Sequence, residues 1–175
     1  MLLPNLYSNT VSSPIMQDLL QSHILFLQTA NNTVTALQNF GLNFDLLDDD
    51  DHEWMIVGHA ETEVGKLRIL IGIRDNPVQW VLFVYHPLAI VSTLRPIAAE
   101  LLMRINSELA IGNWEMDMDS GSIRFRIGLS VEGQAISIPH MTQTLDTAML
   151  ALLKYHTPLV HTLFDGMDPV EALGH

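Results

Sequence analysis

The chain has 175 residues, which is enough for one domain of ordinary size with a hydrophobic core of its own. Its composition, 48% apolar and 16% charged, is too hydrophobic for a disordered protein, and the absence of cysteine excludes disulfide scaffolds, thiol nucleophiles and thiolate metal sites. The net charge of −12 is opposite in sign to that of most nucleic-acid-binding domains. We therefore expect a single acidic globular domain over residues 1–175, with no nucleic acid among its partners.

Targeting and membrane signals are not apparent. The N-terminus has no basic residue ahead of its short apolar run, so it does not resemble a secretory signal. Apolar stretches such as Val81–Tyr85 are far shorter than the ~20 residues that span a bilayer. A cytoplasmic location without membrane insertion is expected.

The first part of the chain predicts helices followed by an acidic loop. A Ser-Pro pair is a typical helix start, and apolar residues then recur at helical spacing, which predicts a helix over 14–28. A second helical piece is expected over 33–40, with a glycine directly after it as the stop. Four consecutive aspartates then mark an acidic loop over 45–53.

Three strands are expected next, over 54–60, 66–74 and 78–86. The segment 66–74 alternates strictly, with leucine and isoleucines on one face and basic side chains on the other. The segment 78–86 is apolar on both faces, which indicates a strand that is covered on both sides.

The turn between the last two of these strands decides which face of 78–86 is internal. If residues 75–77 form the loop, Ile71 faces Val81 in the core, and the opposite face of 78–86 is open. That face requires a cover, which is a second subunit, a client protein or a helix of the same chain. We predict the first of these, a dimer or partner surface made of Leu70, Trp80, Leu82 and Val84.

A β-hairpin is expected over 114–127, with Ser120 and Gly121 as its two-residue turn. In this register Met116 faces Phe125, every apolar residue meets an apolar one, and every acid meets a base. The further expected pairs are Trp114 with Ile127, Met118 with Ile123, Glu115 with Arg126, and Asp117 with Arg124.

Two helices flank this hairpin. The first follows Pro96 and is expected to end at Gly112 in a left-handed conformation, which a side chain would disfavour. The second begins near Pro139 and should break or kink at Pro158, with short helical pieces after it. The order α-(α)-β-β-β-α-β-β-α predicts an α+β fold, in which helices pack on an antiparallel sheet of three strands plus the hairpin.

No constellation of residues points to catalysis or to a metal. His156 and His161 are five residues apart, so they do not share a helical face as two ligands would. The segment 117–121 resembles the opening of a calcium loop, but the fifth and twelfth positions of that loop are glycines here. The aspartates 48–51 fit a solvated loop better than an ion site, and the common nucleophile and phosphate-binding motifs are missing. We expect no catalytic, cofactor or metal site; an enzyme of unrecognised type ranks third among the functions considered.

Three stretches of the C-terminal half carry a family resemblance: 101–106 (LLMRIN), 112–117 (GNWEMD) and 121–126 (GSIRFR), with the ending 164–173 (FDGMDPVEAL). Together they resemble the YbjN-type domain, whose fold is similar to that of type III secretion chaperones. The resemblance implies a homodimer that holds partner segments in extended form and has no established enzymatic activity. That family is also described as regulators of sensory transduction.

In this pattern Asn106, Gly112, Asp117, Gly121 and Arg124 are expected to be structural residues, and the amide of Asn106 to hold the loop that follows its helix. The function predicted from the sequence is a non-catalytic protein-binding module, chaperone-like or regulatory, that forms a homodimer, holds a protein client and carries no cofactor. The alternative is a regulatory domain that responds to a small molecule or an ion through the acidic loop and a pocket between sheet and helices.

Overall fold

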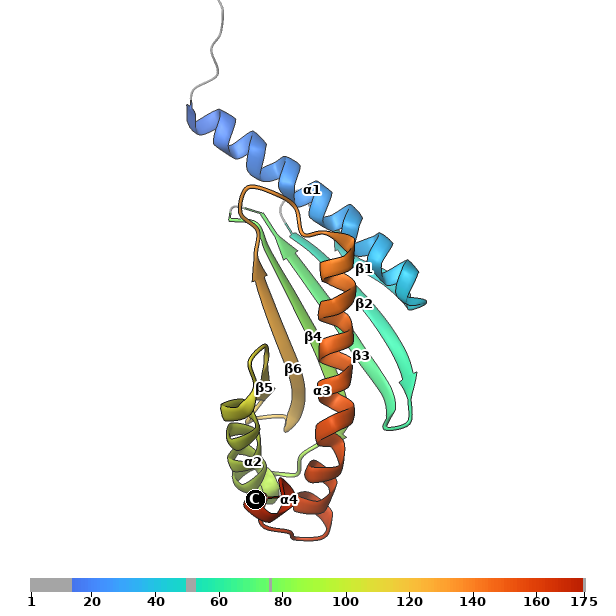
Figure 1. Ribbon diagram of the computed structural model, residues 1–175, viewed down its shortest axis with the longest axis vertical. Helices are drawn as coiled ribbons and strands as arrows, with labels where there is room; N and C mark the ends of the chain where they lie inside the picture. The colour runs from blue at the N-terminus through green and yellow to red at the C-terminus, as the bar shows by residue number, and fades with distance from the viewer. Residues whose placement is uncertain (1–13, 50–52, 76, 175) are drawn as a thin grey trace, which may run out of the picture.

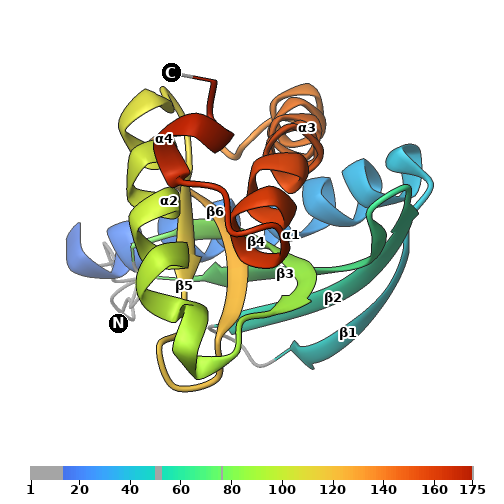
Figure 2. The ribbon, with the colours of Figure 1, turned by 90° about the horizontal axis from the view of Figure 1, so that it is seen from below.

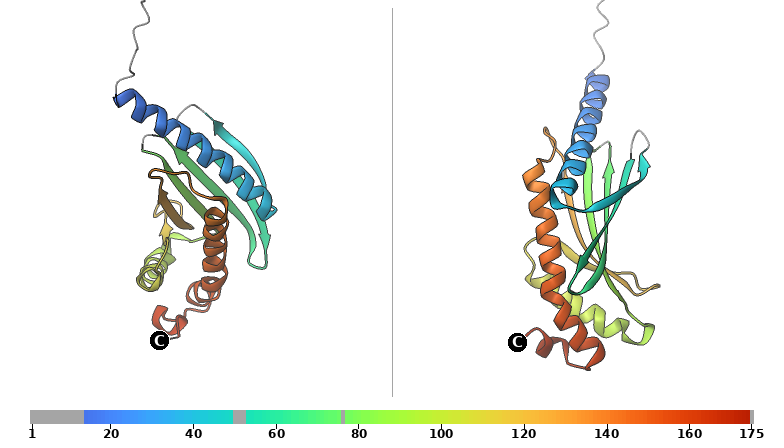
Figure 3. Two further views of the ribbon diagram at one scale, coloured as in Figure 1. Left: turned by 45° about the horizontal axis from the view of Figure 1, so that its top comes forward. Right: turned by 90° about the vertical axis from the view of Figure 1, so that its right-hand side faces the viewer.

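A computed structural model describes residues 14–49, 53–75 and 77–174 of the chain. In it, six antiparallel strands form one open sheet, and the helices pack against one face of that sheet (Figures 1 and 3). The predicted α+β class is confirmed. The elements are α1 (Pro14–Phe40), β1 (Asn43–Asp49), β2 (Glu53–Thr62), β3 (Gly65–Arg74), β4 (Gln79–Ala89), a 3-10 turn η1 (Ser92–Leu94), α2 (Arg95–Glu108), β5 (Asn113–Met116), β6 (Ser122–Ser130), α3 (Ile138–Phe164) and α4 (Pro169–Ala172).

The strand order is β1-β2-β3-β4-β6-β5, so β6 pairs with β4 and the hairpin continues the main sheet. An additional edge strand, β1, occupies residues 43–49, where the sequence predicted the start of an acidic loop. Acidic residues have low strand propensity, but they suit an edge strand because charge discourages pairing with another chain. Residues 50–52 of the predicted loop lie outside the described residues.

The predicted register of the hairpin is wrong by two residues. Met116 lies opposite Ile123 and not Phe125, and Glu115 lies opposite Arg124. A shift of two residues keeps each side chain on the same face of the sheet, because side chains alternate with a period of two. The match of apolar and charged pairs in the sequence therefore cannot distinguish the two registers.

A longer turn accounts for this shift. The Asp117 N–H donates to the Ser122 carbonyl at 2.9 Å, and the Gly121 N–H donates to the Asp117 carbonyl at 2.8 Å. Residues 118–121 therefore form a four-residue turn, where the sequence analysis placed a two-residue turn at Ser120 and Gly121.

Helix α1 is continuous, where two pieces over 14–28 and 33–40 were expected. The buried residues of the helix extend from Leu25 to Leu37 and so include part of the polar run between the two predicted pieces. The hydroxyl of Thr33 accepts a hydrogen bond from Trp80 Nε1 at 3.0 Å and donates one to the Thr29 carbonyl at 2.8 Å. These bonds satisfy the Thr33 hydroxyl and Trp80 Nε1, so Thr33 is buried without interrupting the helix, whereas the Thr29 hydroxyl has no hydrogen-bond partner within the described residues.

The other helices depart from the predictions at two points. Helix α3 continues through Pro158, with Tyr155 and Leu159 buried on either side, so Pro158 does not break the helix, and the alternative of a kink stays a prediction. Helix α2 ends at Glu108, and Gly112 lies in the loop beyond it and is not the helix stop. The short helix expected near the C-terminus is present as α4, which packs against α2 and α3 at one end of the molecule (Figure 2).

The hydrophobic core lies between the sheet and the helices. Its strand residues alternate, and Ile71 lies opposite Leu82. Arg74, the last residue of β3, pairs with Gln79, the first residue of β4. Four residues, 75–78, therefore connect the two strands, where three were expected. One additional residue reverses the faces of β4, and the predicted orientation of this strand is therefore wrong. None of the described helices combines the length and the apolar character needed to cross a membrane.

Candidate functional site

One face of the sheet carries no helix within the described part of the chain (Figure 3). Side chains from neighbouring strands form rows across this face, because directly opposite residues in antiparallel strands point to the same side. We call the residues of β3, β4 and β6 that form these rows the open face. Its three rows are Arg68, Tyr85 and Arg124; Leu70, Phe83 and Arg126; and Gly72, Val81 and Gly128.

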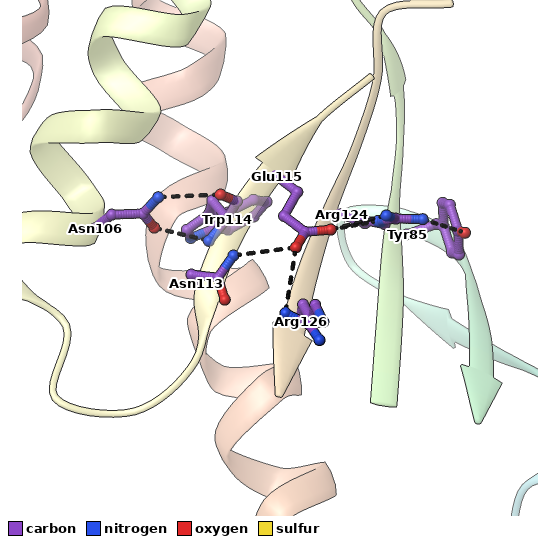
Figure 4. Close-up of polar contacts among 7 residues, drawn as sticks. All are labelled: Tyr85, Asn106, Asn113, Trp114, Glu115, Arg124 and Arg126. Carbon is purple, nitrogen blue, oxygen red and sulfur yellow. Dashed lines mark hydrogen bonds and ion pairs between the residues drawn. The ribbon is translucent and has the colours of Figure 1, made fainter. Parts of the chain in front are cut away.

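Arg124 lies at the centre of the polar contacts on the open face (Figure 4). Its Nε donates to Glu115 Oε2 at 2.8 Å, and its Nη1 donates to the Tyr85 hydroxyl at 3.0 Å. Its guanidinium carbon lies 4.3 Å from the centroid of the Phe83 ring. Burial alone would lower the pKa of Arg124, but the hydrogen bonds to Tyr85 and Glu115 outweigh this effect and raise it. Arg124 is therefore a fixed cation within this face.

Arg68 and Arg126 retain more hydrogen-bonding capacity than Arg124. The guanidinium carbon of Arg68 stacks 4.0 Å from the centroid of the Tyr85 ring, and Arg68 forms no ion pair with a carboxylate of the described residues. Arg126 Nη1 lies 3.8 Å from Glu115 Oε1, which is longer than a hydrogen bond. Both arginines can therefore donate to a bound anionic group.

A shallow hollow lies beside these arginines. A Cβ atom added to Gly72 would meet nothing within 4 Å, so the surface is open above this glycine. Glycine weakens the interior of a strand and often marks a place where another backbone or a ligand approaches closely. The apolar part of its lining consists of Gly72, Met55, Leu70, Val81 and Phe83, and its polar part consists of Arg126, Gln79 and the ion pair of Arg74 with Glu53.

The charge of this face is opposite to that of the chain as a whole. The three rows of the open face contain three basic residues and no acidic one, whereas the net charge of the whole chain is −12. A local excess of positive charge in a strongly acidic protein attracts anionic groups. The basic residues are Arg68, Arg124 and Arg126, and Glu115 of the neighbouring strand β5 lies opposite Arg124.

Only one of the four residues predicted to form a partner surface lies on the open face. This residue is Leu70, which is half-buried. Trp80, Leu82 and Val84 are fully buried in the core on the opposite side of the sheet, so the prediction is wrong for these three. The physical reason is the four-residue connection between β3 and β4.

Two of the predicted structural residues join β5 to the body of the protein. Asn106 Nδ2 donates to the Trp114 carbonyl at 3.0 Å, and its Oδ1 accepts from the Trp114 N–H at 2.7 Å, which ties α2 to β5 (Figure 4). Gly112 has a φ of +76°, and a Cβ atom there would lie 2.5 Å from the Phe125 ring. Gly112 is therefore needed for the loop to pass over this ring.

Two further residues hold the turn between β5 and β6. The Asp117 carboxylate accepts from the N–H groups of Asp119 and Ser120, at 2.8 and 3.0 Å. These bonds, that to Ser120 first, lower the pKa of Asp117, which is a turn residue and not the partner of an arginine across the hairpin. Gly121 has a φ of +74°, and a Cβ atom there would overlap the carbonyl of Ile90. Both residues support the strands that carry the open face.

Two histidines meet between the sheet and α3: His86 is near the end of β4, and His156 is on α3. His86 Nε2 and His156 Nδ1 are 3.1 Å apart, and the Leu88 N–H donates to His86 Nδ1 at 3.1 Å. Nδ1 of His86 is therefore an acceptor, and its Nε2 carries the proton that is donated to His156. Burial, followed by the proximity of His156, lowers the pKa of His86 to about 4. Sequence reasoning weighed His156 only against His161 on the same helix, because the partner comes from a distant strand.

The sequence analysis did not predict the residues that form the open face, although two features of the sequence indicated them. Gly72 and Gly128 interrupt strands that are otherwise strong, and Arg124 and Arg126 alternate with apolar residues in a chain that has few basic residues. Val81 was expected in the core, but it lies on the open face together with Phe83, because the connection between β3 and β4 is one residue longer than expected. With the correct length of the connection between β3 and β4, these residues would have been predicted to lie on one face.

No family model matches the chain, and no curated protein matches it. The resemblance to the YbjN-type domain therefore stays a prediction. Within residues 14–49, 53–75 and 77–174, no three His, Asp or Glu side chains gather into a group that could hold a metal ion.

Proposed function

We propose that this protein is a non-catalytic binding module that holds an extended segment of a partner protein on its open face. The observation that carries the proposal is the combination of positive charge, arginines stacked on aromatic rings and a partly apolar hollow on one face of an acidic chain. The client-holding role implied by the family resemblance is part of this proposal.

The chemistry of the face specifies the kind of segment that would bind. Arg68 and Arg126 have donors for carboxylates, and an arginine can bind a carboxylate through two parallel hydrogen bonds. The hollow above Gly72 has room for an apolar side chain of the partner. The expected client is therefore an acidic segment that also carries isolated apolar residues.

A protein segment fits this face better than a single-stranded nucleic acid. Proteins that bind single strands offer aromatic rings on which bases stack. Here the Tyr85 ring is covered by Arg68, and the Phe83 ring lies against Arg124.

Fluorescence anisotropy with labelled peptides tests the proposal. The probe is a glutamate-rich peptide with isolated leucines, and the comparison peptide replaces each glutamate by lysine. We expect the acidic peptide to bind and the basic one not to bind. The Arg126→Ala variant should weaken binding about tenfold, because a desolvated interface arginine commonly contributes over 1 kcal/mol. The matched control is Arg104→Ala, which removes the same charge from the exposed surface of α2, where Arg104 pairs with Glu100.

A second variant separates binding from stability. Gly72→Val fills the hollow and favours the strand, so it should abolish peptide binding while leaving the unfolding temperature unchanged or higher. The proposal is rejected if the acidic and basic peptides bind alike, if Arg126→Ala and Arg104→Ala have equal effects, or if a single-stranded oligonucleotide competes fully for the face.

A further inference from the structure

The N-terminal half of α1 projects beyond the sheet (Figures 1 and 3). Every residue from 14 to 21 is exposed. The helix is tied to the body just after this segment, where Ser22 Oγ donates to Asp75 Oδ1 at 2.6 Å and His23 Nδ1 lies 3.2 Å from Asp75 Oδ2. A helical segment as short as 14–21 is marginally stable in water unless it packs against a partner.

The projecting part of the helix and the first residues after its contact with Asp75 carry exposed apolar side chains. At 100° per residue they occupy one half of the helix circumference, whereas Gln17, Asp18, Gln21 and Gln28 occupy the other half. These apolar side chains are between 39% and 72% exposed, which is unusual for a set of neighbouring large aliphatic residues. We call this set the α1 stripe: Ile15, Leu19, Leu20, Ile24 and Leu27.

The charge of the helix indicates what covers the stripe. Asp18 is the sole charged residue among the 27 residues of α1, counting histidine as neutral. Two copies of a chain with a net charge of −12 repel one another over most of their surfaces. Two copies repel one another least where their α1 helices meet, because the apolar half of this helix carries no charge. In such a pair each copy presents the α1 stripe to the other.

We infer that the α1 stripe is the surface at which two copies of this chain associate, as an antiparallel pair of helices. With the crossing near residue 22, Leu20 of one copy packs against Ile24 of the other. The two Asp18 residues are then eight residue positions apart, which is about 12 Å at 1.5 Å per residue. This separation exceeds the screening length of about 8 Å at physiological salt, so the two charges do not oppose pairing.

Obligate interfaces bury ~2,000 Å² or more, and the five partly exposed side chains of the α1 stripe cannot supply this area. The expected dimer is therefore reversible. The open face lies on the side of the sheet away from the helices, so it stays accessible in this dimer. The inference does not depend on the proposed function, because it concerns a different surface and a different partner.

Sedimentation velocity over a concentration series of the full chain tests the inference, with Leu20→Glu and Gln21→Glu as matched variants. Both add one negative charge to adjacent exposed positions, but only Leu20 lies on the stripe. We expect the wild type and Gln21→Glu to form dimers at about 100 µM. Leu20→Glu should raise the dissociation constant at least tenfold, with circular dichroism and unfolding temperature unchanged because residue 20 is exposed.

A wild type that is monomeric throughout the series overturns the inference, and this includes the case in which residues 1–13 of the same chain cover the stripe. A dimer that persists in Leu20→Glu overturns it as well, since another surface is then responsible. Because the chain has no cysteine, the orientation is testable by disulfide formation in a mixture of Leu20→Cys and Ile24→Cys proteins. In an equal mixture, random pairing makes the mixed disulfide equal to the two homodimers together; we expect the mixed disulfide to exceed their sum, and a predominance of the homodimers overturns the antiparallel arrangement.

Discussion

The buried histidine pair makes the stability of this protein dependent on pH in a specific window. His86 is 5% exposed and neutral in the folded protein, with its two ring nitrogens bonded to Leu88 and His156. Protonation places a charge in the core and removes the acceptor used by the Leu88 N–H. The pKa of His86 is therefore lowered from 6.5 to about 4 by burial, with a smaller effect of His156.

The direction and size of the effect follow from this pKa. The unfolded chain binds a proton at His86 near pH 6.5, whereas the folded chain binds it only near pH 4. The stabilisation is thus complete above pH 6.5 and is lost as the pH falls from 6.5 towards 4. At 1.36 kcal/mol per pH unit, the free energy of unfolding should decrease by about 3 kcal/mol over this window.

Urea unfolding of the wild type and of His86→Gln, at about pH 7.5 and about pH 4.5, measures this loss. The variant lacks the titrating ring, so its stability should fall by about 2 to 3 kcal/mol less than that of the wild type between the two pH values. Carboxylates titrate in both proteins and cancel in the comparison. Equal losses in the two proteins, or an NMR titration of His86 with a midpoint near 6.5, would refute the argument.

Three substitutions test the remaining structural conclusions. Asn106→Ala leaves the buried N–H and carbonyl of Trp114 without partners and should cost about 2 kcal/mol in urea unfolding; a loss below about 0.5 kcal/mol would show that these hydrogen bonds contribute little. Gly121→Ala forces alanine into a left-handed φ and brings its Cβ atom into overlap with the Ile90 carbonyl. It should reduce the free energy of unfolding by about 2 kcal/mol or more, seen as a lower thermal midpoint; an unchanged midpoint contradicts the turn geometry. Leu82→Glu buries a charge at a fully buried position and should yield an unfolded or insoluble protein in circular dichroism and solubility assays; a folded, soluble monomer would instead support the dimer surface that the sequence predicted.

The class of the fold and most of its elements were predictable from local patterns. The alternation along 66–74 identified β3, the apolar run along 78–86 identified β4, and helical spacing identified the cores of α1 and α2. These signals depend on residues close together in the chain, and the period of two or 3.6 residues is set by backbone geometry alone.

Register and facing could not be predicted in this way, because both depend on the number of residues in a connection. Four residues between β3 and β4, in place of three, moved Trp80 from the expected surface into the core, where it bonds to Thr33. The four-residue turn at 118–121 changed each partner across the hairpin without changing the face of any side chain. Alternation shows that a strand has two different faces, but only packing against the helices decides which of them is buried.

The candidate site depended on the same tertiary decisions. Arg68 and Phe83 lie on consecutive strands joined by a short connection, whereas Arg124 is on β6 and is distant from both in the sequence. Arg124 becomes their neighbour because β6 pairs with β4, with its hairpin partner β5 at the edge. The residue types on each strand were visible in the sequence, as was the scarcity of basic residues in an acidic chain. Their gathering on one uncovered face required the strand order and the burial of the opposite face, which are long-range interactions that local propensity does not contain.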